Sequence, residues 1–180
     1  VEAKLESVDI NRVKGTLTNR LGIPLEDCTL VYGGKGGKVY PLGNLPVDGS
    51  VVVEKRTTED LNGHLSRRAA PFVGTQARYV QAYNQPSQFN PNDLVFTMMF
   101  HDRLPEGNQF AANDYFNDLD LSEQLDHERA ILVGRVSSKG SKLILNDGEV
   151  NENIQRACYL RVILPVTKGA PEAPFEAPKL

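Results

Sequence analysis

Short stretches of alternating apolar and polar residues, broken by glycine and proline about every 8 to 12 residues, constrain the fold of this chain most. Five such stretches occupy the first part of the sequence, at 4–10, 13–18, 29–32, 38–40 and 51–53. In the second stretch Val13 and Leu17 fall on one face, which is the period-two pattern of a strand with one buried side. We expect residues 33–37 to form a loop and residues 42–46, Leu-Gly-Asn-Leu-Pro, to end the strand before them.

The last part of the chain returns to strand patterns. Residues 130–136 are a continuous apolar run, typical of a central strand. Residues 142–145 precede Asn-Asp-Gly at 146–148, a strong signal for a tight turn, and 159–164 form a final strand that stops at Pro165. The sequence therefore predicts a mainly β (α+β) protein, and the strand spacing favours an immunoglobulin-like β-sandwich.

Residues from about 56 to 128 differ from the rest and predict a polar, partly helical insertion in this sandwich. Asn90 suits a helix cap and Pro91 the first turn, and 105–107 would end this helix. Apolar residues at helical spacing lie between these ends: Leu94, Val95, Met98, Met99 and Leu104. Residues 120–125 indicate a second short helix, whereas 63–89 support no assignment.

We expect residues 1–166 to form a single domain and residues 167–180, rich in proline and alanine, to form a linker. A linker that runs to the last residue, and a first residue that is not methionine, indicate that further segments flank this one. The sequence itself has no apolar run of about 18 residues that could span a bilayer.

Composition and charge narrow the classes of function. Of the 180 residues, 20 are Lys or Arg and 23 are Asp or Glu, which gives a net charge of −3 and no general attraction to nucleic acid or anionic membranes. Cys28 and Cys158 both fall in apolar, strand-like stretches, which favours two buried thiols. A disulfide between them is the alternative, and it requires the two strands to be neighbours.

Motifs that carry chemistry are weak, and we expect no metal and no cofactor. The glycine-rich loop 33–38 lacks the first glycine and the Ser/Thr of a phosphate-binding loop. His101 and Asp102 are the weak candidates for catalysis, but neighbouring helical residues point about 100° apart, so we expect the two not to face each other. The three histidines, His64, His101 and His127, lack metal-ligand spacing, and the acidic stretch 114–123 lacks the order of a calcium loop.

Aromatic residues in the insertion offer a possible binding surface. Flat rings on a polar segment either anchor it to the sandwich or line a groove for a glycan or peptide. The candidates are Tyr79, Tyr83, Phe89, Tyr115 and Phe116.

Three stretches taken together resemble the extracytoplasmic region of bacterial membrane-anchored proteins of unknown function. They are 15–45, 119–134 and 145–165. The resemblance implies a β-rich module outside the membrane, in the periplasm or at the cell surface, which is held there by flanking segments. It implies no activity.

We therefore expect a non-catalytic module for protein interaction, sensing or spacing in the cell envelope, with an envelope protein as partner and no nucleic acid. A carbohydrate-binding module and a cell-envelope hydrolase that uses His101 are the alternatives. The absence of tryptophan counts against the first of these, and the lack of a spaced catalytic pair counts against the second.

Overall fold

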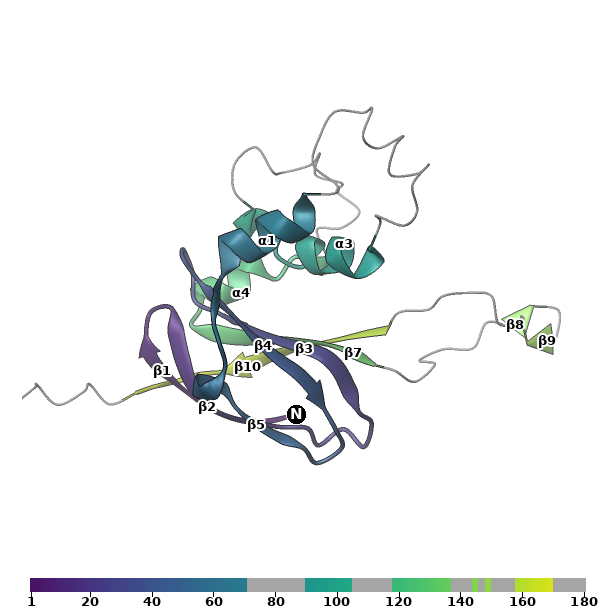
Figure 1. Cartoon of the computed structure of the whole chain (residues 1–180), viewed down its shortest axis with the longest axis horizontal. Coiled ribbons are helices and arrows are strands. Elements are labelled where there is room, and N and C mark those ends of the chain that lie inside the picture. Colours follow the sequence, from purple (N-terminus) through teal and green to yellow (C-terminus); the bar gives the residue numbers. More distant parts are fainter. Residues whose placement is uncertain (71–89, 105–117, 137–143, 146–147, 150–157, 170–180) are drawn as a thin grey trace, which may run out of the picture.

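The computed structural model describes residues 1–70, 90–104, 118–136, 144–145, 148–149 and 158–169. The fold is mainly β, with two sheets and a layer of short helices (Figure 1). The first sheet has the spatial order β11 (Thr167–Lys168), β1 (Glu2–Asp9), β2 (Arg12–Thr18) and β5 (Ser50–Val52). The second sheet has the order β10 (Cys158–Pro165), β7 (Arg129–Val136), β3 (Leu25–Tyr32), β4 (Lys38–Leu45) and β6 (Glu59–Asp60).

The main core lies between the two sheets. Alternate residues of each strand point into it, so Leu5 and Leu17 of the first sheet meet Leu30, Tyr40 and Leu132 of the second, all buried. The Tyr40 hydroxyl accepts a hydrogen bond from the Val13 backbone N–H at 3.0 Å, which satisfies a polar group inside this core. The burial of alternate strand residues in this core therefore explains the period-two pattern of the sequence.

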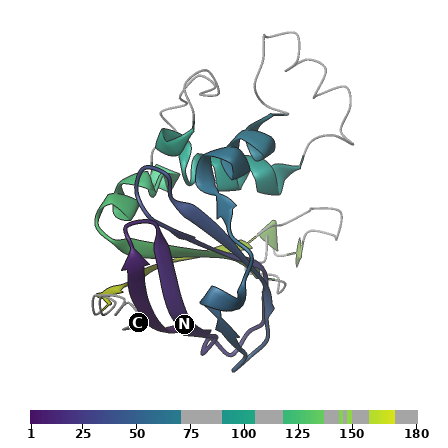
Figure 2. The ribbon, with the colours of Figure 1, turned by 60° about the vertical axis from the view of Figure 1, so that its left-hand side comes forward.

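A second core lies on the other face of the second sheet, under the helices. The helices are α1 (Leu61–Ala69), α3 (Pro91–Met98) and α4 (Ser122–Asp126), with short 3-10 turns η1 (Val53–Lys55) and η3 (His101–Arg103). Leu65 and Phe100 from this layer pack on Val31 and Ile131 of the sheet. Figures 1 and 2 show the helices gathered on one side of the second sheet, away from β1 and β2. Because β7 is covered on both faces, its sequence is apolar at every position from Ala130 to Val133.

Strand β4 corrects one expectation from the sequence. It does not end at residue 42 but continues to Leu45, through Pro41 and Gly43. Pro41 pairs with Thr29 of β3 on one side, while on the other side β6 pairs only with Lys38 and Val39. Proline is tolerated here because this part of β4 is an edge within the described chain, so no N–H is needed on its outer side.

The helices agree with the sequence in part. Asn90 caps α3, its side chain accepting from the Asn92 N–H at 3.0 Å, which confirms the predicted helix start. The predicted helix is too long, because α3 ends at Met98 and the chain turns at Phe100 before η3. Helix α1 falls where no helix was assigned, with Asp60 as its cap.

The end of the described chain differs from the sequence-based expectation of a linker from residue 167. Thr167 and Lys168 pair in parallel with Glu6 and Ser7, so the first sheet holds the chain beyond residue 166, and residues 170–180 lie outside the described part. None of the described helices is both long and apolar enough to cross a membrane. The hairpin predicted around residue 146 is present as β8 (Ile144–Leu145) paired with β9 (Gly148–Glu149).

The cysteines are free thiols, and only one of them is buried. Cys28 is 1 % exposed, whereas Cys158 is exposed, which corrects the expectation of two buried thiols. A disulfide between them is excluded in this fold because β7 lies between their strands in the sheet.

Candidate functional site

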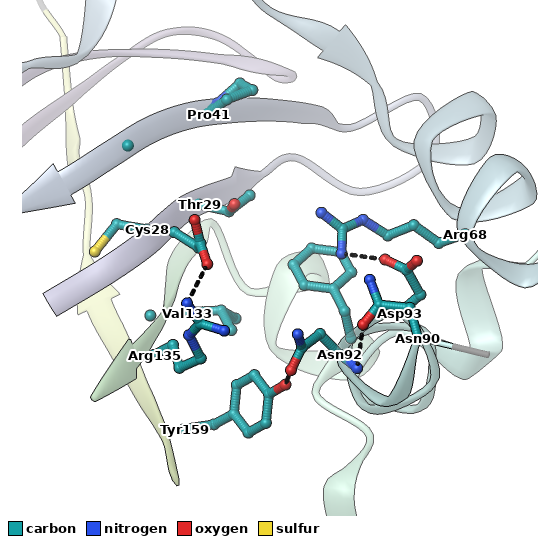
Figure 3. Close-up of a pocket in the computed structure, with 14 residues that line it drawn as sticks. Cys28, Thr29, Pro41, Arg68, Asn90, Asn92, Asp93, Val133, Arg135 and Tyr159 are labelled. Atoms are coloured by element: carbon teal, nitrogen blue, oxygen red, sulfur yellow. Dashed lines mark hydrogen bonds and ion pairs between the residues drawn. The ribbon is translucent and has the colours of Figure 1, made fainter. Parts of the chain in front are cut away.

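A cleft of about 380 Å³ lies between the outer face of the second sheet and the helices. Strands β3, β4, β7 and β10 form its floor, and α1 with the start of α3 forms its wall (Figure 3). Its volume falls at the lower end of the range of small-molecule sites, roughly 300–1,000 Å³.

The floor of the cleft contains an irregularity in β3. Pairing of β3 shifts register between Leu25 and Thr29 with respect to β4, and between Glu26 and Thr29 with respect to β7. Asp27 has a positive φ of 50° at this point, and its N–H donates to Asn44 Oδ1 at 3.1 Å. A bulge of this kind turns side chains away from strict alternation. Consecutive residues from Asp27 to Thr29 therefore all line the cleft.

Gly134 of β7 keeps the floor open beside this bulge. A Cβ atom at Gly134 would lie 3.1 Å from Cys28 Sγ, tighter than ordinary van der Waals contact. The glycine therefore accommodates the Cys28 side chain. Burial raises the pKa of this thiol to about 11, so Cys28 is protonated at neutral pH and contributes a small apolar surface rather than a nucleophile.

One side of the cleft carries Arg135 from β7. Its Nη2 donates to Glu26 Oε2 at 2.9 Å and contacts Asp27 Oδ2 at 3.1 Å. Both acidic residues belong to the bulged segment of β3, so the bulge gives this guanidinium its counter-charges.

The opposite side carries Arg68 from α1, which is held by three contacts. Its Nε donates to His64 Nε2 at 2.8 Å, and its Nη1 donates to Asp93 Oδ1 at 2.8 Å. The guanidinium also stacks over the Phe96 ring, 4.6 Å from its centre. Figure 3 shows Arg68 reaching from α1 toward the strand that carries Thr29, with Asp93 beside it.

His64 stands behind Arg68 and fixes its direction. The ring is 8 % exposed, and its Nδ1 lies 2.7 Å from Glu59 Oε2. Since Nε2 accepts from Arg68, the imidazole is neutral and its proton is on Nδ1, donated to Glu59. Burial lowers the pKa of His64, and the hydrogen bond from His64 lowers the pKa of Glu59, so both shifts favour this arrangement.

Tyr159 of β10 closes the lower side of the cleft. Its hydroxyl donates to Asn92 Oδ1, which ties the edge strand to the first turn of α3 (Figure 3). Burial raises the pKa of Tyr159, so the hydroxyl keeps its proton for this bond. The cleft thus joins residues from α1, from the start of α3 and from four strands.

Two groups of the cleft that often take part in proton transfer or nucleophilic attack are engaged or protonated. Both ring nitrogens of His64 are engaged, and the Cys28 thiol is protonated, so neither supplies a general base or nucleophile in this state. The remaining lining offers guanidinium, amide and hydroxyl groups on largely fixed side chains.

The site residues expected from the sequence lie elsewhere. The five candidate aromatic residues, Tyr79, Tyr83, Phe89, Tyr115 and Phe116, lie outside the described residues. His101 and Asp102 belong to η3 and are not among the residues that line the cleft. The expectation that they do not face each other is wrong, because Nδ1 of His101 lies 3.5 Å from Oδ1 of Asp102. The two residues lie in a 3-10 turn and not in an α-helix, and their side chains approach each other although neighbours in such a turn also point apart about the axis.

Asp120 joins His101 and Asp102, and the possible ligand atoms of the three lie within 4.8 Å of one another. This is the group in the described chain whose geometry comes nearest to a metal site. Both oxygens of Asp120 already accept backbone hydrogen bonds, from Ser122 at 2.7 Å and from Asp102 at 2.9 Å. These two hydrogen bonds hold the Asp120 carboxylate in place, because each of them caps a turn of the chain.

Sequence reasoning missed the residues that build the cleft. Arg68, Arg135 and Tyr159 come from segments far apart in the chain, and each looks like an ordinary surface residue in its own segment. One local signal was available: His64 and Arg68 are four residues apart, which places them on one face once a helix begins after Asp60.

Fold and cleft together define a class: a two-sheet β protein with a helical layer over one sheet and a polar cleft between the two. The family model of the domain of unknown function DUF8725 matches residues 1–158, so the chain belongs to that family. No curated protein and no solved structure matches the chain.

Proposed function

We propose that this protein is a non-catalytic binding module whose ligand occupies the cleft between the second sheet and the helices. The observation that carries the proposal is the polar lining itself, in which Arg68, Arg135 and Tyr159 are each held by hydrogen bonds to other residues. Fixed polar groups around a cavity reduce the entropy that binding must overcome, which is typical of recognition sites.

The strand order supports an immunoglobulin-like arrangement for this module. Strands β1, β2 and β5 share one sheet, and β10, β7 and β3 share the other. An immunoglobulin domain divides its first, second and fifth strands from its third, sixth and seventh in the same way. On this interpretation the helices are an insertion between the fifth and sixth strands of the sandwich, and domains of that kind commonly present or bind ligands.

The setting we propose is extracytoplasmic, in a longer membrane-anchored protein of the bacterial envelope. Its support is the sequence resemblance of 15–45, 119–134 and 145–165 to such regions. In that setting the module would couple occupancy of the cleft to an envelope protein partner.

Binding to the cleft is tested by screening a library of small polar compounds against the protein by amide NMR. We expect compounds that bind to shift the amide signals of Arg68, Asn92, Gly134 and Tyr159 together. A bulky ring at the rim, Asn92→Trp, should abolish these shifts, whereas Asn62→Trp on the exposed face of α1 should leave them unchanged. Binding that is unaffected by Asn92→Trp, or the lack of any compound that shifts this set, would refute the proposal.

A further inference from the structure

Arg68 is the best-fixed charged group of the cleft, and its fixation leaves one side of the guanidinium available. His64 takes Nε, Asp93 takes Nη1, and Phe96 covers one face. Within the described chain the second terminal nitrogen, Nη2, makes no hydrogen bond, and Arg68 lines the cleft. The side chain is 29 % exposed, so part of it is accessible from the cleft.

We propose that Arg68 anchors the ligand by binding a carboxylate group, and that the ligand is a small molecule or chain end in which a carboxylate neighbours an amide. This inference rests on the proposed binding function. A guanidinium binds carboxylates through charge-assisted N–H···O bonds, and its planar fork selects flat acceptor groups.

The second part of the ligand is inferred from the opposite side of the cleft. Arg135 uses Nη2 for Glu26 and Asp27, and within the described residues its Nε and Nη1 make no hydrogen bond. The Asn92 amide nitrogen likewise has no acceptor in the described part of the chain, because its bond to Tyr159 uses Oδ1. These donors are available to a ligand acceptor, and a peptide-type carbonyl supplies one.

The charges of the cleft favour a single carboxylate over a more highly charged anion. Arg68 pairs with Asp93, and Arg135 pairs with both Glu26 and Asp27; of these carboxylates, Asp93 and Asp27 also line the cleft. A phosphate dianion would bring a second negative charge close to these two carboxylates without a further cation to offset it. A monocarboxylate adds one charge between two arginines.

The test uses pairs of probes that differ at one group. N-acetylated dipeptides with a free terminal carboxylate are compared with the same dipeptides as carboxamides, with inorganic phosphate as a third probe, by amide NMR titration. We expect the free acids to shift the cleft signals and to bind at least about tenfold more tightly than the carboxamides or phosphate.

Two variants test whether Arg68 causes the preference for the free acid over the carboxamide. Arg68→Gln should remove the difference between acid and carboxamide, while Arg67→Gln, the same change at the exposed neighbour that pairs with Glu59, should retain it. The acid-to-carboxamide ratio of the unsubstituted protein tests the inference even if Arg68→Gln fails to fold.

Failure of this inference is distinguishable from failure of the proposed function. Equal binding of acids and carboxamides, tighter binding of phosphate, or no binding of any dipeptide would overturn the carboxylate anchor. Compounds of other chemistry that shift the cleft signals in the library screen would still support a binding module.

Discussion

At the scale of single residues, burial and local partners separate side chains that look alike in the sequence. Cys28 and Cys158 both lie in strands, but Cys28 faces the floor of the cleft and the core while Cys158 lies exposed at the first position of the edge strand β10. The three histidines differ in the same way. His64 is enclosed by Glu59, Arg68 and Phe96, whereas His127 is exposed.

The two thiols should differ sharply in reactivity. At pH 7.5 we expect iodoacetamide to modify Cys158 and leave Cys28 intact, because the pKa of Cys28 is raised to about 11 and its side chain is buried. Mass spectrometry of tryptic peptides measures each site, and Cys158→Ser removes the fast reaction. Rapid labelling of Cys28 in the folded protein would contradict the placement of this thiol.

The buried His64 should make stability depend on pH. Its pKa is lowered from 6.5 by burial, so below this pH the unfolded chain binds a proton that the folded protein resists. The free energy of unfolding should therefore be highest above pH 6.5 and fall as the pH drops below it, by at most about 1.4 kcal/mol per pH unit, until the pH reaches the lowered pKa. Glu59, whose pKa is also lowered, adds a further loss below 4.5.

Urea unfolding at a series of pH values measures this slope. His64→Gln should flatten it between neutral pH and about pH 5, and His127→Gln, at an exposed position, should leave it as it is. An unchanged slope in His64→Gln would mean that His64 is not held neutral by its surroundings.

At the scale of elements, the most constrained strand is β7, which contacts the core between the sheets with Ala130 and Leu132 and the helices with Ile131 and Val133. We expect Val133→Asp to unfold the protein or to cost about 4 kcal/mol or more, because Val133 is 4 % exposed and packs in the apolar core under the helices, where a carboxylate loses its hydration. A thermal melt followed by circular dichroism measures the loss.

The matched control is Ile163→Asp in the neighbouring strand β10, where the side chain is 41 % exposed. It should cost less than about 1 kcal/mol. Similar melting temperatures for Val133→Asp and the unsubstituted protein would contradict the buried, central position of β7.

The sequence predicts the elements in which the order of apolar and polar residues directly reflects which of those residues are buried. Alternation identifies β1 and β2, the apolar run identifies β7, and the Asn-Pro pair identifies the start of α3. Strand β4 was cut short because Pro41 and Gly43 are local breakers, and only the edge position of that segment makes them acceptable. The sequence does not reveal helix α1 because Gly63 and five polar side chains weaken its apolar pattern, and packing on the sheet supplies the stability that propensity lacks.

The cleft cannot be predicted from the sequence, because it too depends on how separate segments come together. Its geometry depends on a bulge at Asp27 and on the approach of α1 and α3 to the sheet, and neither is encoded by local periodicity. The charges of Arg68 and Arg135 are visible in the sequence, but their partners become visible only in three dimensions.

At the scale of the whole molecule, strands from the two parts of the chain pair side by side within one sheet, with β7 next to β3. Leu30 of β3 pairs with Tyr40 on one side and with Leu132 on the other. The core between the sheets therefore needs both ends of the chain at once.

Separately expressed fragments 1–55 and 129–166 should each fail to fold, because each would expose the apolar face that the other covers. Circular dichroism and thermal melts of the two fragments measure this, with the intact chain as the reference. A cooperative transition in either fragment would show that the sheets do not depend on each other.

The parallel pairing of β11 with β1 has a mechanical consequence. Glu6 lies opposite Thr167 and Ser7 opposite Lys168, and the Thr167 hydroxyl donates to the Leu5 carbonyl at 2.9 Å. A force pulling the start of β1 away from the end of β11 would slide the two strands lengthwise, so the bonds between them would share the load instead of opening one after another. Under such a load, this short pair of strands would keep the two ends of the described chain joined in the first sheet.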